Sequence, residues 1–242
     1  MSAGVVAALM AEARTLGSPP RARGPFAIPD GTLVAVSGMG GVAAAAAARA
    51  LIDAGATALV SWGMAGGLDP SLPAGTICLP VSVLSSGGAT LGTHHHWREA
   101  VGAALAARRR IADGKLLTTG VAIHDAAGKA AAFRATGAVA VDMESFAVAE
   151  VAATRGLPFL VVRAIVDTAS DSLPGAVLAA SGAGQVNILR LIQGLMRSPL
   201  DLVPLMGLAK RYRAATRSLA AVARSGSLAP LAFAVASGNR IT

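Results

Sequence analysis

Short apolar runs alternate with alanine-rich runs along most of this 242-residue chain. The apolar runs are rich in β-branched residues and end at glycine, proline or polar residues, which is typical of strands. The predicted strands are Gly4–Leu9, Leu33–Ser37, Ala58–Trp62, Thr76–Leu84, Leu116–Ile123, Ala138–Val141 and Pro158–Val166. The predicted helices are Gly41–Ala54, Trp97–Ala112, Ala126–Thr136, Glu144–Arg155 and a segment within Gly175–Met196. This alternation favours a layered α/β domain around a mixed, mostly parallel central sheet.

Composition narrows the class of protein. With 54% hydrophobic and 14% charged residues, the chain can bury one substantial core. The single cysteine, Cys78, allows no internal disulfide and is interpreted as a buried hydrophobe on a strand. No basic segment precedes Gly4–Met10, and the charge-free run Pro70–Thr93 is broken by Pro, Gly and Ser. We therefore predict a cytoplasmic protein without a secretory signal or a membrane span.

The net charge of +8 comes mostly from the end of the chain. No acid follows Asp201, whereas six basic residues do: Lys210, Arg211, Arg213, Arg217, Arg224 and Arg240. The rest is close to neutral, so no nucleic acid is expected as a partner. We predict a main domain of residues 1–198 and a basic helical extension of residues 199–242.

Within that extension, Leu205–Arg224 has apolar residues at helical spacing with basic residues between them. The pattern predicts a basic amphipathic helix. Two interpretations stay open: the helix packs on the body with a solvated basic face, or it makes peripheral contact with anionic lipid at the inner membrane face.

Two carboxylates stand where ligands bind in a parallel sheet. Glu144 opens an alanine-rich helix, and Asp167 closes the apolar strand Pro158–Val166. The carboxyl end of such a strand and the amino end of the next helix face one crevice. We expect both acids to face a substrate there.

Two glycine-rich segments, Ser37–Val42 and Trp62–Leu68, follow strands and are predicted as turns that let backbone approach a ligand. A dinucleotide site at Gly38-x-Gly40 would need an acid at the end of the next strand, and Ala58–Trp62 has none.

Glu12 follows the first strand and is the third acid of interest. Alone, it is more simply a helix N-terminal residue stabilised by the dipole. The other two strand-end acids need a partner, which favours Glu12 as a third acid of the same site.

Other polar motifs have structural interpretations. His94, His95 and His96 are consecutive and so converge poorly on one metal ion, which leaves no metal site in the prediction. Asp125 is expected to cap the helix that begins at Ala126. Arg163, inside an apolar strand, is expected to pair with a buried acid.

Five segments together resemble the nucleoside phosphorylase/nucleosidase superfamily. They are Gly4–Glu12, Ser37–Ala44, Gly63–Leu68, Val141–Ser145 and Val162–Asp167, in the order and near the spacing of that family. The chain looks most similar to methylthioadenosine/S-adenosylhomocysteine nucleosidases and to a hopanoid-associated branch that cleaves adenine from adenosylhopane. The resemblance covers roughly residues 4–198 and implies a three-layer nucleoside-phosphorylase-type fold.

The resemblance also implies roles for residues. Asp167 would bind the adenine edge and donate a proton toward N7, and Glu12 would orient or deprotonate the attacking water. Glu144 with Met143 would hold the ribose hydroxyls. The remaining substrate-binding positions would be the ribose-site backbone of Gly66 and Gly67 and a packing contact of Ile123 with the base.

The implied reaction is hydrolysis of the N-glycosidic bond of a 5′-modified adenosine, and adenosylhopane, giving ribosylhopane and adenine, is the expected substrate. The implied reaction needs no metal or cofactor. Phosphorylases of this fold carry an arginine just before the second glycine segment, where this chain has Ser61 and Trp62, so water is the expected nucleophile. Phosphorolysis, a soluble methylthioadenosine-type nucleosidase, and a noncatalytic adenosine-binding or membrane-scaffold protein stay open as alternatives. Relatives form oligomers, so a homodimer is expected.

Overall fold

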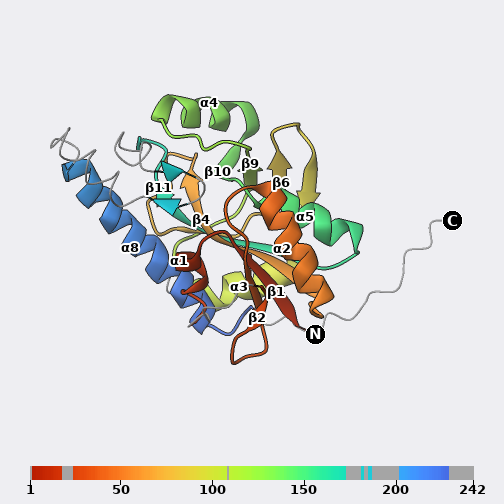
Figure 1. The fold of residues 1–242 in the computed structure, drawn as a ribbon. Helices are drawn as coiled ribbons and strands as arrows, with labels where there is room; N and C mark the ends of the chain where they lie inside the picture. Colours follow the sequence, from red (N-terminus) through yellow and green to blue (C-terminus); the bar gives the residue numbers. More distant parts are fainter. Residues whose placement is uncertain are drawn as a thin grey trace.

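The computed structural model describes residues 2–17, 24–107, 109–172, 181–182, 185–186 and 202–228 (Figure 1). Its main feature is one eleven-stranded mixed sheet. The strands are β1 (Ala3–Ala7), β2 (Phe26–Ala27), β3 (Leu33–Val36), β4 (Ala58–Gly67), β5 (Ile77–Cys78), β6 (Ser82–Ser85), β7 (Thr90–Gly92), β8 (Ile111–Ala112), β9 (Lys115–Thr118), β10 (Ala138–Asp142) and β11 (Phe159–Asp167). A separate pair is formed by β12 (Ser181–Gly182) and β13 (Gln185–Val186).

The centre of the sheet is parallel, as the alternation of elements predicts. Strand β4 lies between β1 and β11 and is parallel to both, and β3 continues this parallel group beyond β1. At its far end β4 also pairs with β10 in the antiparallel sense. Because parallel strands end at the same edge, β1 and β11 deliver the residues that follow them to one rim of the sheet.

Helices cover both faces of this sheet, which gives three layers (Figure 1). On one face, α2 (Gly41–Asp53) and α5 (Ser145–Thr154) share a buried cluster with β4 and β11. On the other face lie α3 (His95–Leu105) and α8 (Leu202–Arg224). The short α1 (Met10–Ala13) follows β1, and α4 (Ala126–Thr136) packs near β10 at one end. The predicted α/β fold is confirmed.

Several boundaries differ from the sequence predictions. Segment Trp62–Leu68 is not a turn, because β4 continues through it to Gly67. The run Thr76–Leu84 splits into β5 and β6 around Pro80, which has no N–H for the ladder. The strand predicted at Leu116–Ile123 ends at Thr118, and the helix predicted to reach Ala112 ends at Leu105. The helix predicted within Gly175–Met196 lies mostly outside the described residues.

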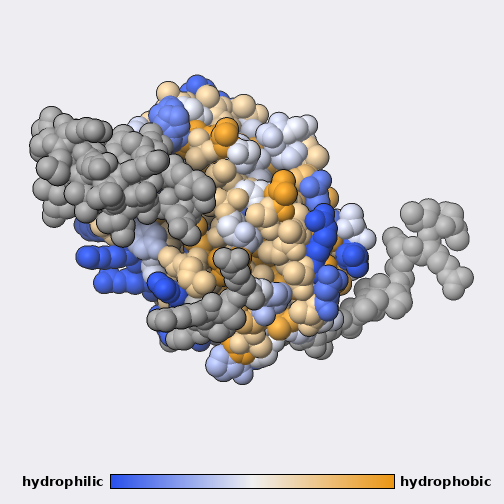
Figure 2. Space-filling model, viewed as in Figure 1, coloured by the Kyte–Doolittle hydropathy of each residue, from blue (hydrophilic) through white to orange (hydrophobic). Residues whose placement is uncertain are grey.

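Helix α8 packs on the body of the protein. Its Ala215, Leu219 and Val222 side chains are fully buried in the same cluster as β1, β4 and β11. Its exposed residues include Lys210, Arg213, Arg217 and Arg224. Figure 2 shows strongly hydrophilic side chains along the edge that α8 occupies.

Packing on the body is the first of the two interpretations open for this helix. Within the described part of the chain, no helix is both long enough and apolar enough to cross a membrane. The division of the chain at residue 198 stays a prediction, because residues 187–201 are not described.

Candidate active site

One cavity of about 300 Å³ opens at the rim where the parallel strands end. Residues from six strands or the segments after them line it, and helix α8 adds Tyr212. The described lining consists of Ala8, Leu9, Glu12, Met39, Met64, Ala65, Gly66, Thr119, Ala122, Ile123, Val141, Asp142, Met143, Glu144, Val166, Asp167 and Tyr212. The lining is thus mainly apolar, with four carboxylates as its charged groups.

Glu12 is fixed by two backbone N–H groups. Its Oε2 accepts a hydrogen bond from Leu9 N at 2.9 Å, which caps the first turn of α1, and its Oε1 accepts one from Met64 N on β4 at 2.8 Å. The side chain is 4% exposed. Burial raises the pKa of Glu12 above its ordinary value of 4.5, although Arg163 and these hydrogen bonds oppose the rise. Both sequence interpretations therefore hold together: Glu12 caps a helix and faces the cavity.

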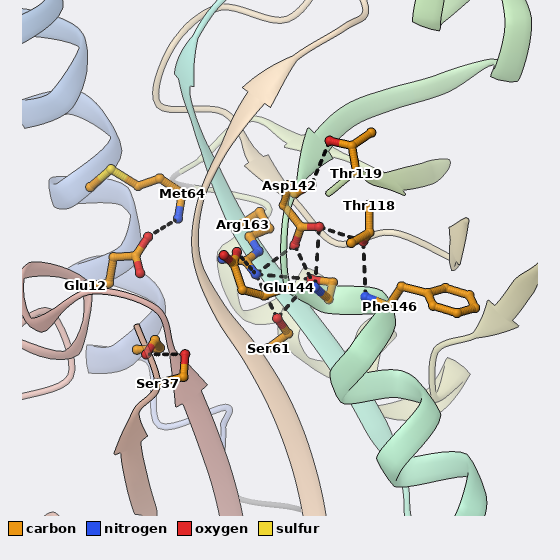
Figure 3. Close-up of polar contacts among 12 residues, drawn as sticks. Glu12, Ser37, Ser61, Met64, Thr118, Thr119, Asp142, Glu144, Phe146 and Arg163 are labelled. Carbon is orange, nitrogen blue, oxygen red and sulfur yellow. Dashed lines mark hydrogen bonds and ion pairs between the residues drawn. The ribbon is translucent and has the colours of Figure 1, made fainter. Parts of the chain in front are cut away.

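Arg163 is buried at the centre of an acidic cluster (Figure 3). Its Nη2 is 2.7 Å from Asp142 Oδ2 and 3.6 Å from Glu144 Oε2. The same nitrogen donates to Ser61 Oγ at 2.9 Å and to Ser145 Oγ at 3.2 Å. The prediction that Arg163 pairs with a buried acid is confirmed.

Gly63 makes room for this cluster on β4. A Cβ atom at this position would lie about 2.5 Å from Glu12 Oε1 and would also overlap Arg163 Nη1. Any side chain there would separate the carboxylate from the guanidinium. Gly63 is thus required for packing within a strand, and not for a turn.

Asp142 and Glu144 both lie just before the start of α5. Glu144 Oε1 accepts a hydrogen bond from Gly40 N at 2.8 Å, so the first glycine segment does approach this site. Burial raises the pKa of Glu144, Arg163 lowers it, and Asp142 raises it again. Asp142 accepts a hydrogen bond from Thr118 Oγ1 at 2.7 Å and turns its other oxygen to Arg163.

Asp167, at the end of β11, has a cation of its own. Its Oδ2 is ion-paired with Lys129 Nζ, and the lysine side chain is 0% exposed. Burial raises the pKa of Asp167, and Lys129 opposes that rise by charge and by hydrogen bonding. Gly66 of β4 lies beside this carboxylate, since a Cβ atom there would be 3.3 Å from Asp167 Oδ2.

The residues predicted for the site come together. Glu12, Gly66, Ile123, Met143, Glu144 and Asp167 all line the cavity. Gly67 is not part of the lining, because it packs against Ile165 and the backbone of Asp167. What each residue does with a substrate stays a prediction.

Three features of the site were missed from the sequence. Lys129 was included only as part of an alanine-rich helix, and nothing in its neighbours distinguishes it from an exposed lysine. Tyr212 reaches the cavity from a helix more than 40 residues beyond Asp167 along the chain. The hydroxyls of Ser61 and Ser145 bond to each other at 2.9 Å and solvate Arg163. The sequence signal that could have identified these two serines is a polar residue within an apolar run.

The remaining motifs have structural roles. Asp125 caps α4 by accepting a hydrogen bond from Gly128 N at 2.7 Å, as predicted. His94 caps α3 through Trp97 N at 3.3 Å. Cys78 is buried, as predicted. The described residues contain no group of His, Cys, Asp or Glu side chains arranged to hold a metal ion.

Comparisons with known proteins identify the family and the fold. Residues 27–193 match the family model of the phosphorylase superfamily. A search of curated protein sequences finds no match.

Solved structures share the fold. The 5′-methylthioadenosine/S-adenosylhomocysteine nucleosidase of Neisseria meningitidis, in complex with methylthio-immucillin-A, superposes with a TM-score of 0.67 at 18% identity, over 93% of this chain and 98% of that one. The Helicobacter pylori nucleosidase gives 0.66 at 16% identity, over 92% and 97%. A futalosine hydrolase mutant of H. pylori gives 0.59 at 17% identity, over 68% and 88%.

Proposed function

Because the chain belongs to the phosphorylase superfamily, we propose that it is a nucleosidase that hydrolyses the N-glycosidic bond of a 5′-modified adenosine. The observation that supports this most directly is the gathering of Glu12, Glu144 and Asp167 around one cavity of about 300 Å³. Cleavage of this bond develops positive charge on the sugar and negative charge on the leaving base, so it benefits from carboxylates at both places.

Each carboxylate has a distinct task in this proposal. Asp167, protonated, gives its proton to N7 of the adenine as the bond from C1′ to N9 breaks. Glu144 accepts hydrogen bonds from the ribose hydroxyls. Glu12 takes a proton from the water whose oxygen forms the new bond to C1′. The products are adenine and the free 1-hydroxy sugar, and the two carboxyl groups then exchange one proton through solvent.

The charge of the cavity favours water over phosphate as the nucleophile. The described lining contains four acids, Glu12, Asp142, Glu144 and Asp167, and neither lysine nor arginine. The buried Arg163 is already engaged by Asp142 and Glu144. A phosphate dianion would meet uncompensated negative charge there, whereas water would not.

The 5′ substituent of the substrate is proposed to be large and apolar, with adenosylhopane as the specific substrate. Leu9, Met39, Met64 and Val166 give the cavity an apolar lining, and Tyr212 brings α8 to its edge. A methylthio group would also fit such a lining. That smaller group defines the alternative, a methylthioadenosine-type nucleosidase, and a relative of this fold binds methylthio-immucillin-A.

The first experiment measures adenine release from adenosylhopane in detergent and from methylthioadenosine, with and without phosphate. We expect phosphate-independent release from adenosylhopane by the wild type and a loss of about 10²–10⁴-fold in Asp167→Asn. Release that requires phosphate would identify a phosphorylase. Turnover of methylthioadenosine alone would support the smaller substrate, and no release from either compound would favour a noncatalytic adenosine-binding protein.

Peripheral membrane contact through α8 completes the proposal and has its own test. The four exposed basic residues Lys210, Arg213, Arg217 and Arg224 are changed together to Gln, which leaves the buried side of the helix intact. Sedimentation with anionic vesicles should fall strongly, because each basic residue near such a surface contributes about 1 kcal/mol. A matched control changes the exposed Arg49, Lys115, Arg134 and Arg155 to Gln. Equal binding by both variants would contradict membrane contact through α8.

A further inference from the structure

Lys129 is buried beside the cavity without lining it. It lies near the start of α4, at the fourth residue of the helix, and its side chain is 0% exposed. Lysine is almost never fully buried unless it is paired. Its ammonium group therefore occupies a site built to receive it.

All three N–H bonds of Lys129 have acceptors. Besides Asp167 Oδ2, the Nζ atom donates to Thr168 O at 2.8 Å and to Asp171 O at 3.0 Å. These acceptors belong to Asp167 itself and to two of the four residues after it. The lysine thus ties α4 to the end of β11 and holds the segment that carries the acid.

One oxygen of Asp167 remains for a ligand. Oδ2 faces Lys129, and among the described residues no hydrogen bond is donated to Oδ1. Asp167 lines the cavity, but Lys129 does not. Any influence of Lys129 on a bound base must therefore pass through the carboxyl group.

We propose that Lys129 is a positioning residue of the nucleosidase site, which acts on the leaving base through Asp167 by holding one carboxyl oxygen and leaving the other to face the purine. This inference rests on the proposed function. It adds a group that the sequence does not distinguish from a surface lysine.

The charge of Lys129 also adjusts the acid. Burial raises the pKa of Asp167, and a raised pKa favours the protonated form that a general acid needs. Lys129 lowers the pKa, Asp171 raises it and Arg211 lowers it. Of these groups Lys129 has the largest effect, so its removal should shift the pKa of Asp167 upward.

The test compares two leaving groups in Lys129→Met. Adenine needs a proton to leave, whereas 4-nitrophenolate, from 4-nitrophenyl β-riboside, does not. With a misplaced acid, kcat/KM for adenine release should fall about 10- to 100-fold, while cleavage of the nitrophenyl riboside should change less than about threefold. In the plot of kcat/KM for adenine release against pH, the alkaline limb of Lys129→Met should lie at higher pH than that of the wild type. The maximum value of kcat/KM should be lower.

Further variants separate this role from stability. Lys129→Arg keeps the charge and should keep the alkaline limb of the pH–rate profile near its wild-type position. Lys129→Gln removes the charge but keeps a hydrogen-bond donor, and it serves in place of Lys129→Met if that variant does not fold. Arg134→Met changes an exposed cation of the same helix and should leave both substrates and the profile unchanged.

The outcomes distinguish the two proposals. Equal losses on both substrates, or an unmoved alkaline limb in Lys129→Met, would overturn the role of Lys129 and leave the nucleosidase proposal standing. A wild-type protein that releases no adenine would overturn both.

Discussion

The two ends of the cavity differ in how many buried carboxylates share one buried cation. At the Glu12 end, one arginine, Arg163, faces three acids, since Asp142 and Glu144 lie on its other sides. At the Asp167 end, one lysine faces one acid. Both cations are buried, but the first group contains three acids for one cation, and the second contains one acid for one cation.

This difference matches two opposite proton transfers. An excess of acids with raised pKa values can accept a proton and can stabilise positive charge on a sugar. At the other end a single carboxyl group, with a pKa that burial raises, faces one cation, so Asp167 can act as a general acid when it carries its proton. In the proposed function, the Glu12 end accepts a proton and the Asp167 end donates one.

Glu12→Gln should give the largest effect. The amide cannot take a proton from water, so we expect kcat/KM to fall about 10²–10⁴-fold. The pH profile is the sharper readout. Glu12 must be ionised to act, and burial raises its pKa above 4.5, so wild-type activity should be lost as the pH falls through that raised pKa.

In Glu12→Gln this acid limb should disappear while the alkaline limb stays, and Asp167→Asn should show the reverse. If both variants lost the same limb, the two ends would not have separate tasks. Circular dichroism spectra of the variants provide the control for folding.

Arg163→Met should have the next largest effect, on stability. It leaves three buried acids without their shared cation, and removing one partner of a buried pair costs about 3–5 kcal/mol. Urea unfolding measures this free energy. Arg134→Met, at an exposed position, should change it by less than about 0.5 kcal/mol. A similar small change for Arg163→Met would mean that the acids are buried in their neutral forms.

Arg211→Gln should have the smallest effect. Arg211 Nε lies 3.2 Å from Asp171 Oδ2, and both side chains are partly exposed. Such a pair contributes about 0.2–1 kcal/mol. The variant should lower the free energy of unfolding by that amount relative to Lys210→Gln, and adenine release should stay within about twofold of wild type. A large loss of activity with unchanged stability would indicate that α8 controls the segment around Asp171.

The sequence predicted the layered fold, and it pointed to three of the acids that line the cavity because strand ends are marked by composition. Glu12, Glu144 and Asp167 each follow or begin an apolar run, and acids at those places stand out in a chain with only 13 of them. The parallel strands β1 and β11 then bring Glu12 and Asp167 to one rim. Glu144 arrives there from β10, which is antiparallel to β4.

The rest depends on contacts between distant segments. Lys129 and Asp167 are 38 residues apart, and only the docking of α4 near β10 brings them together. Segment Trp62–Leu68 was predicted as a turn because glycine usually breaks strands. Gly63 and Gly66 instead remain in β4 because Glu12, Arg163 and Asp167 occupy the space their side chains would need.

Strand β4 limits which changes of sequence this site can accept. Met64 N holds Glu12, and two residues later Gly66 lies beside Asp167. Two residues of strand advance the backbone by about 6.6 Å, so the spacing of Glu12 and Asp167 depends on two peptide units of β4 as well as on the contacts that hold each side chain. A single inserted residue between Met64 and Gly66 would alter it at once.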